Sequence, residues 1–175
     1  MRGNMQFIGS SADQEAVVKD AVNAATDYIA SADQYLVNPP SDSTGERYTT
    51  WFGQDEPQRH AYVDSVFNNL VNNDLTTFIY DCSTCTDPDS FGFVYPDQFG
   101  TVYLGPRFWQ APVTGTDSQA GFLIGGASQF LANGGTKNHK YGQDDCRELA
   151  RTKPWDAVTN ADSYQYFAEN APPLS

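Results

Sequence analysis

The chain carries few side chains that could act as nucleophiles or metal ligands, because it contains three cysteines and two histidines. Cys82 and Cys85 form a C-x-x-C spacing, which suits a local disulfide, half of a metal site, a redox pair or two leftover thiols. A zinc site built on this pair would need two further ligands, and His60 and His139 are the only histidines. Two histidines also support no Ser-His-Asp or Cys-His constellation. The cysteine and histidine content therefore favours neither a structural metal nor a nucleophilic triad.

A second unusual feature is a glycine pair inside an apolar helical segment. Residues Ser118 to Leu131 are apolar in a helical rhythm, yet Gly121, Gly125 and Gly126 lie among them. Each interior glycine destabilises a helix by roughly 1 kcal/mol relative to alanine. Two adjacent glycines therefore need a specific explanation.

The surrounding sequence predicts several helices and a small sheet. Apolar residues recur at three- and four-residue steps in two long segments, and two shorter segments show the same rhythm. These helices are expected at Asp13–Tyr35, Arg59–Val71, Gln143–Thr152 and Asp162–Glu169. Between Thr77 and Leu104 the pattern changes to aromatic and β-branched alternation with turn residues, which indicates short strands and hairpins. We predict an α+β fold that is mainly helical, with a small antiparallel sheet.

Length and composition restrict the class of protein. A chain of 175 residues can bury one sizeable core, so we expect one domain over residues 1–175. The net charge of −12 repels phosphate backbones and anionic lipid, which argues against nucleic acid and membrane partners and favours a peptide or a basic small molecule. Acidity that only maintains solubility is the alternative. No apolar run is long enough for a membrane span, and residues 1–10 lack the pattern of a signal peptide. We expect a monomer.

Motifs along nearly the whole chain, from about Ile8 to the end, point to a known family. They are Arg47-Tyr-Thr-Thr-Trp-Phe-Gly53, Arg59-His60, Val94-Tyr-Pro96, Phe99-Gly-Thr-Val-Tyr-Leu104, Ala111-Pro-Val-Thr-Gly-Thr-Asp-Ser-Gln-Ala-Gly121, Asn133-Gly-Gly-Thr136, Tyr141-Gly142 and Asn160-Ala-Asp162. With these motifs the chain resembles the fungal peptidyl-Lys metalloendopeptidases of the deuterolysin, or aspzincin, group. The resemblance implies a zincin-like metalloprotease fold.

The resemblance also implies where a catalytic zinc site would lie. The family carries His-Glu-x-x-His on the helix after Ser118 and an aspartate ligand in the following loop. In this chain the positions of the family's two histidines are occupied by Gly125 and Gln129. The position of the glutamate base is occupied by Gly126, and that of the aspartate ligand by Asn138. None of these residues offers an imidazole or a carboxylate. We therefore predict no metal, no cofactor and no peptidase activity, which makes the chain a pseudoenzyme.

Part of the substrate-binding region is retained. In the family an aspartate and a glutamate receive the lysine side chain, and the matching positions here are Asp162 and Gln165. Tyr141 matches a tyrosine that helps to stabilise the transition state, and we expect Tyr164 to line the same cleft. One remaining carboxylate attracts an ammonium group more weakly than two. An equally simple interpretation of Asp162 is a cap at the N-terminus of the helix that follows it.

Three kinds of function are compatible with these features. The first is binding of a peptide, a protein or a small cationic ligand without cleavage. The second is a bulk, defence or carbohydrate- and surface-recognition protein whose cleft is vestigial. The third is an enzyme, with residual metallopeptidase activity or with a different activity on the remodelled site.

The disulfide framework that the resemblance implies is incomplete. Relatives join the residue matching Cys82 to an N-terminal cysteine, and the residue matching Cys85 to a cysteine at the position of Gly105. Near Gly9 there is no cysteine here. Each lost bridge removes roughly 2 to 4 kcal/mol of stabilisation. The loss indicates relaxed demands on stability, a local bridge between Cys82 and Cys85, or a reducing compartment. Of these we favour an intracellular location, although the family is secreted.

Overall fold

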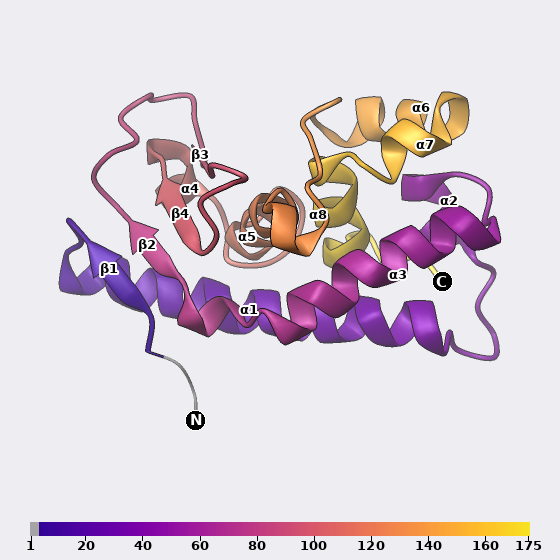
Figure 1. Ribbon diagram of the computed structural model, residues 1–175, viewed down its shortest axis with the longest axis horizontal. Helices are drawn as coiled ribbons and strands as arrows, with labels where there is room; N and C mark the ends of the chain where they lie inside the picture. The colour runs from indigo at the N-terminus through magenta and orange to yellow at the C-terminus, as the bar shows by residue number, and fades with distance from the viewer. Residues whose placement is uncertain (1–3) are drawn as a thin grey trace.

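Helices dominate the computed structural model, which describes residues 4–175 (Figure 1). Residues 1–3, the start of the segment expected to lack a signal peptide, lie outside this range. The elements in chain order are β1 (Gln6–Ile8), α1 (Ala12–Val37), α2 (Glu46–Phe52), α3 (Pro57–Asn72), η1 (Leu75–Thr77), β2 (Ile79–Asp81), β3 (Gly92–Phe93), β4 (Thr101–Leu104), α4 (Pro106–Gln110), α5 (Gln119–Ser128), η2 (Leu131–Asn133), α6 (Gln143–Thr152), α7 (Pro154–Ala157) and α8 (Ala161–Glu169). The predicted helical α+β class is confirmed.

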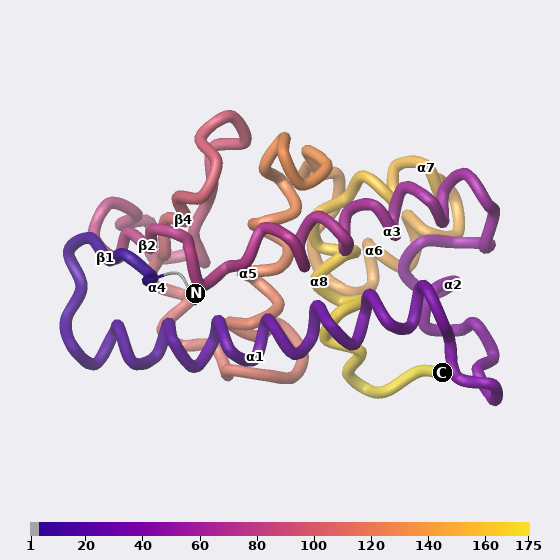
Figure 2. The backbone as a smooth tube through the Cα atoms, turned by 60° about the horizontal axis from the view of Figure 1, so that its bottom comes forward, coloured from indigo at the N-terminus to yellow at the C-terminus, as the bar shows by residue number. Residues whose placement is uncertain are grey.

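The long helix α1 runs along the whole molecule with α3 beside it (Figures 1 and 2). Its start is set by a capping box, in which Ser11 accepts a hydrogen bond from the Gln14 backbone and Gln14 bonds back to the Ser11 backbone. Its buried face is lined by Val18, Ala21, Val22, Ala25, Ile29 and Ala32. The small residues on this face allow α3 and α5 to approach closely.

The sheet differs from the prediction in strand direction. Its order is β1-β2-β4-β3, with β1 parallel to β2, β2 parallel to β4, and only β3 antiparallel to β4. The prediction of an antiparallel sheet was wrong because β1 and β2 are not joined by a hairpin. The chain passes through α1, α2 and α3 between them, and such a crossover returns a strand parallel to the first.

An aromatic cluster joins α8 to α2 and α3. Phe52 of α2, Phe67 of α3, and Tyr164 and Phe167 of α8 are fully buried, with ring centroids 5.0 to 5.5 Å apart. Such contacts add to the free energy of aromatic burial. The cluster fixes α8 against α2 and α3, so that the opposite face of α8 is free to line a cavity.

Within the described residues, no helix is both long enough and apolar enough to cross a membrane.

Candidate functional site

A cavity of about 650 Å³ lies over α5, between the sheet side of the molecule and α8. Its first wall consists of Asp87, Asp89, Phe91, Phe93, Val94 and Arg107, its floor of Phe122, Gly125, Gly126 and Gln129, and its second wall of Asp117, Asn138, Tyr141, Asp162, Gln165 and Tyr166. Residues as far apart in the sequence as Asp87 and Tyr166 thus line one cleft. All the predicted site residues except Tyr164 lie there.

The floor of the cavity is made of backbone and amide groups. A Cβ atom placed on Gly126 would meet nothing closer than the Val94 side chain at 3.8 Å, whereas one on Gly125 would lie 3.2 Å from the Ala161 carbonyl oxygen. The amide of Gln129 donates a hydrogen bond of 3.3 Å to the Asn138 side chain. The four predicted positions therefore line one cavity.

Asp162 is a carboxylate of the second wall. It lies in the first turn of α8 and accepts a hydrogen bond of 3.1 Å from the Gly142 backbone. Burial raises the pKa of Asp162 to about 6, the Gly142 hydrogen bond opposes this shift, and the negative charge of Asp117 adds to it. The N-cap of α8 is Asn160, so the interpretation of Asp162 as a helix cap is not supported.

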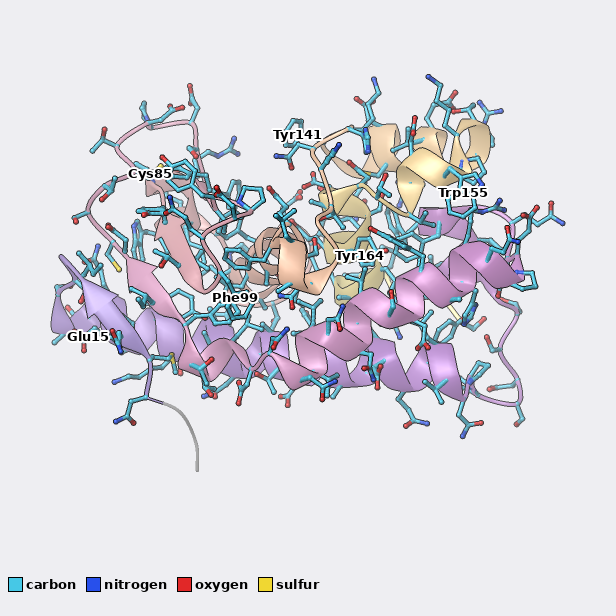
Figure 3. All side chains as sticks on the ribbon, in the orientation of Figure 1. Glu15, Cys85, Phe99, Tyr141, Trp155 and Tyr164 are labelled. Atoms are coloured by element: carbon cyan, nitrogen blue, oxygen red, sulfur yellow. The ribbon has the colours of Figure 1, made fainter. Side chains whose placement is uncertain are left out.

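Gln165 and Tyr141 both line the cavity, but they differ in how far they are exposed to solvent. Gln165 is 8% exposed, and its Nε2 donates to Glu169 at 3.4 Å. Tyr141 is 65% exposed and projects from the loop before α6, away from the core (Figure 3). The two residues therefore mark the bottom and the rim of the same wall.

Tyr164 does not belong to the site, and its assignment as a ligand-binding residue was wrong. It is fully buried between α8 and α3, where its hydroxyl donates to the Val158 carbonyl at 2.6 Å (Figure 3). The reason is helical geometry. Positions three residues apart, such as Asp162 and Gln165, share one face of α8, while position 164 points to the opposite side.

The structure adds two acidic residues that the sequence did not single out. Glu169 is buried and accepts hydrogen bonds from the Ser118 backbone at 2.8 Å and from the Ser118 hydroxyl at 2.7 Å. Asp117 accepts a hydrogen bond from the Tyr166 hydroxyl and lines the cavity. The only sequence signal was an acidic residue directly before the serine that caps α5.

Comparisons with known proteins find relatives in sequence and in structure. A peptidyl-Lys metalloendopeptidase from Grifola frondosa is 44% identical over 169 residues, which are 97% of this chain and 48% of that protein. The protein of the same name from Pleurotus ostreatus is 44% identical, over 97% of this chain and 99% of its own. A solved zinc peptidase from Grifola frondosa superposes with a TM-score of 0.90 at 43% identity, over 95% of this chain and 100% of that one.

The family described as lysine-specific metallo-endopeptidase matches residues 39–169, which is more than half of the chain. This chain belongs to that family. The chain spans about half the length of the Grifola frondosa relative and nearly all of the Pleurotus ostreatus one. The expected zincin-like fold is confirmed by the superposition with the zinc peptidase.

Membership of the lysine-specific metallo-endopeptidase family corrects the prediction of a pseudoenzyme. That prediction depended only on the side chains at four positions. The family and the relatives at 44% identity are named as endopeptidases, which conflicts with the prediction. The prediction that the chain is not an enzyme, with a purely non-catalytic role, was therefore wrong.

The zinc ion that the family name implies does not fit the residues of this cleft. Gly125 has no side chain, and Gln129 and Asn138 offer neutral amides, which are weak zinc ligands beside imidazole and carboxylate. Within residues 4–175, no group of three or more His, Cys, Asp or Glu side chains is placed to hold a metal. We therefore assign no chemical step to a metal ion.

The histidines and cysteines lie outside the cleft of this family member. His60 bonds to Asp55 at 2.9 Å and to the Leu36 carbonyl at 3.1 Å, which fixes α3 to the end of α1. His139 contacts Thr159 on the surface. The three cysteines are free thiols. A Cβ atom on Gly105 would lie 3.0 Å from the Cys85 sulfur, so these two positions are neighbours, as the resemblance implied.

Proposed function

We propose that this chain acts on lysine-containing peptides, which its cleft recognises through the lysine side chain. The observation that carries the proposal is the position of Asp162 inside the cavity. The resemblance to the family assigns lysine binding to this position. Ionised Asp162 offers an opposite charge in a partly buried setting, where it attracts an ammonium group more strongly than it would in water. The peptide backbone would lie along the open cleft, and the side chain would enter it.

The correspondence of Gly125, Gly126, Gln129 and Asn138 with the metal-binding and base positions of the family is part of this proposal. Support comes from their common location on the cavity floor and from the hydrogen bond between Gln129 and Asn138. In the proposal these residues shape the floor, Tyr141 covers the rim, and Asp162 and Gln165 bind and orient the lysine.

Titration calorimetry with two short peptides tests the proposal. One peptide contains a single lysine, and the other contains norleucine, which has nearly the same length and no charge. We expect the lysine peptide to bind at pH 7.5 and the norleucine peptide to bind at least tenfold more weakly. The variant Asp162→Asn should remove most of this difference, because the amide carries no charge. Equal affinities of the wild-type chain for both peptides would refute the proposal.

The same mixtures measure the peptidase activity that the family implies. Mass spectrometry of the lysine peptide after incubation, without metal, with added zinc and with a chelator, detects any cleavage at lysine. Cleavage that zinc supports and the chelator abolishes would extend recognition to catalysis. Asp162→Asn should reduce such cleavage through the Michaelis constant, because Asp162 binds the side chain that stands beside the scissile bond.

A further inference from the structure

The cavity contains a second carboxylate close to Asp162, which family resemblance did not assign to the lysine site. Asp117 lies in the loop before α5 and lines the same cavity. Its charge contributes to the raised pKa of Asp162, so the two carboxylates act on each other through space. Two like charges in one cavity repel, and a cation bound between them relieves that repulsion.

Asp117 is held in place from two sides. The Tyr166 hydroxyl of α8 donates to its Oδ1 atom, and its backbone N–H donates to Glu169 at 3.3 Å. Its backbone φ of +53° lies in the left-handed region, which is uncommon for a residue other than glycine. These contacts fix the direction of the carboxylate.

Three hydrogen-bond acceptors in this part of the cavity have no protein partner among the described residues. Asp117 uses Oδ1 for Tyr166 and leaves Oδ2, while Asp162 uses Oδ2 for Gly142 and leaves Oδ1. Gln165 uses Nε2 for Glu169 and leaves its carbonyl Oε1, although this side chain is more than nine-tenths buried. None of these three atoms is a fully buried atom without a partner, so each is open to the cavity, where a ligand can donate a hydrogen bond to it.

A lysine ammonium group matches these acceptors in number and in charge. It carries one positive charge and three N–H donors and has no acceptor. We infer that Asp117, Asp162 and Gln165 together form the receptor for the lysine ammonium group, with Asp117 as a further specificity-determining residue. This inference rests on the proposed recognition of lysine. It gives the site two carboxylates although the position that is glutamate in the family is Gln165.

The variant Asp117→Asn tests the inference. Asparagine tolerates a positive φ and can still accept from Tyr166, so the loop should keep its shape. We expect the lysine peptide to bind ~5-fold more weakly, as for the loss of a partly exposed ion pair. The variant Tyr166→Phe keeps the charge but releases the carboxylate, and it should weaken binding by a smaller factor. Thermal unfolding of each variant checks that the fold is retained.

A matched control separates the contribution of the Asp117 carboxylate from that of the overall negative charge of the cleft. Asp89→Asn removes one charge from the opposite wall of the same cavity, where Asp89 is exposed. We expect less than a twofold change in affinity from it. A peptide with trimethyllysine keeps the charge and lacks the three donors, so the wild-type chain should bind it at least fivefold more weakly than lysine.

The outcomes distinguish this inference from the proposed function. If Asp162→Asn weakens binding of the lysine peptide while Asp117→Asn binds as the wild type does, the role of Asp117 is refuted and lysine recognition stands. If Asp117→Asn and Asp89→Asn weaken binding equally, Asp117 acts only through net charge and the inference also fails. If neither Asp162→Asn nor Asp117→Asn changes the affinity, the proposed function itself is refuted.

Discussion

At the scale of single residues, Glu169 shows how a buried carboxyl group organises the site. It accepts hydrogen bonds from Ser118 and from the Asp117 backbone, and therefore connects the end of α8 to the start of α5. Burial raises the pKa of Glu169 to about 7, although the Ser118 hydrogen bonds partly oppose the shift. The folded protein consequently holds a proton on Glu169 at pH values where the unfolded chain has released it.

This raised pKa predicts a dependence of stability on pH. Because the folded pKa lies above the unfolded one, the stabilisation is complete at low pH and is lost as the pH rises from ~4.5 to 7. The contribution of Glu169 is about 3 kcal/mol over this range, and Asp162 acts with the same sign. Denaturant unfolding at several pH values should show a shallower decline for Glu169→Gln than for the wild type. If the free energy of unfolding depended on pH in the same way for both proteins, the raised pKa of Glu169 would be contradicted.

At the scale of elements, α5 carries three glycines that serve different purposes. Gly121 faces Glu169, because a Cβ atom there would lie 2.2 Å from the carboxylate oxygen. Gly125 allows the start of α8 to approach, with the Ala161 carbonyl 3.2 Å from a Cβ atom. Gly126 faces the cavity, where a Cβ atom would make only an ordinary contact with the Val94 side chain at 3.8 Å. Close packing of α5 on α8 explains the first two glycines, and the third is not required by packing.

The glycines of α5 give a matched pair of alanine substitutions on one helix. Gly126→Ala should stabilise the protein by about 0.5 to 1 kcal/mol, because alanine restricts the unfolded chain and meets no atom within 3.4 Å. Gly121→Ala should destabilise it by about 1 to 3 kcal/mol, because the new methyl group displaces the buried Glu169. Denaturant unfolding of both variants measures the difference. Equal changes in the free energy of unfolding would show that helix propensity, and not the packing around each glycine, determines the effect.

At the scale of the whole molecule, the net charge of −12 acts on both folding and binding. Part of this charge is concentrated in the cleft, where Asp87, Asp89, Asp117 and Asp162 line one cavity together with a single arginine, Arg107. Such a field attracts cationic peptides and also repels itself in the folded state.

Self-repulsion predicts that sodium chloride stabilises the protein. Raising its concentration from about 0.02 to 0.5 M shortens the Debye length from roughly 20 to 4 Å and should raise the melting temperature. The double variant Asp20→Lys with Asp27→Lys changes two exposed residues of α1. Its melting temperature should rise less with salt, because the variant carries a smaller net negative charge. A melting temperature that falls with salt would mean that favourable ion pairs outweigh the repulsion.

The amino-acid sequence by itself determined the longer helical segments, the family, and the part of the cleft that α5, α8 and the loop between Asn138 and Tyr141 supply. The periodicity over Asp13–Tyr35 predicted α1 to within two residues, because a long amphipathic pattern specifies a helix locally. The short helices α2, α4 and α7 were not predicted, since segments of 7, 5 and 4 residues are too short to show a period.

Only the tertiary structure decided the strand directions and the membership of the site. Strand direction depends on the path of the connecting helices, which no pattern within a strand reports. Tyr164 was expected to line the cleft, but its position on α8 directs it into the aromatic core. Asp117 and Asp162 are 45 positions apart and line one cavity only because α5 and α8 pack together. The second carboxylate of the cleft is therefore a property of the fold.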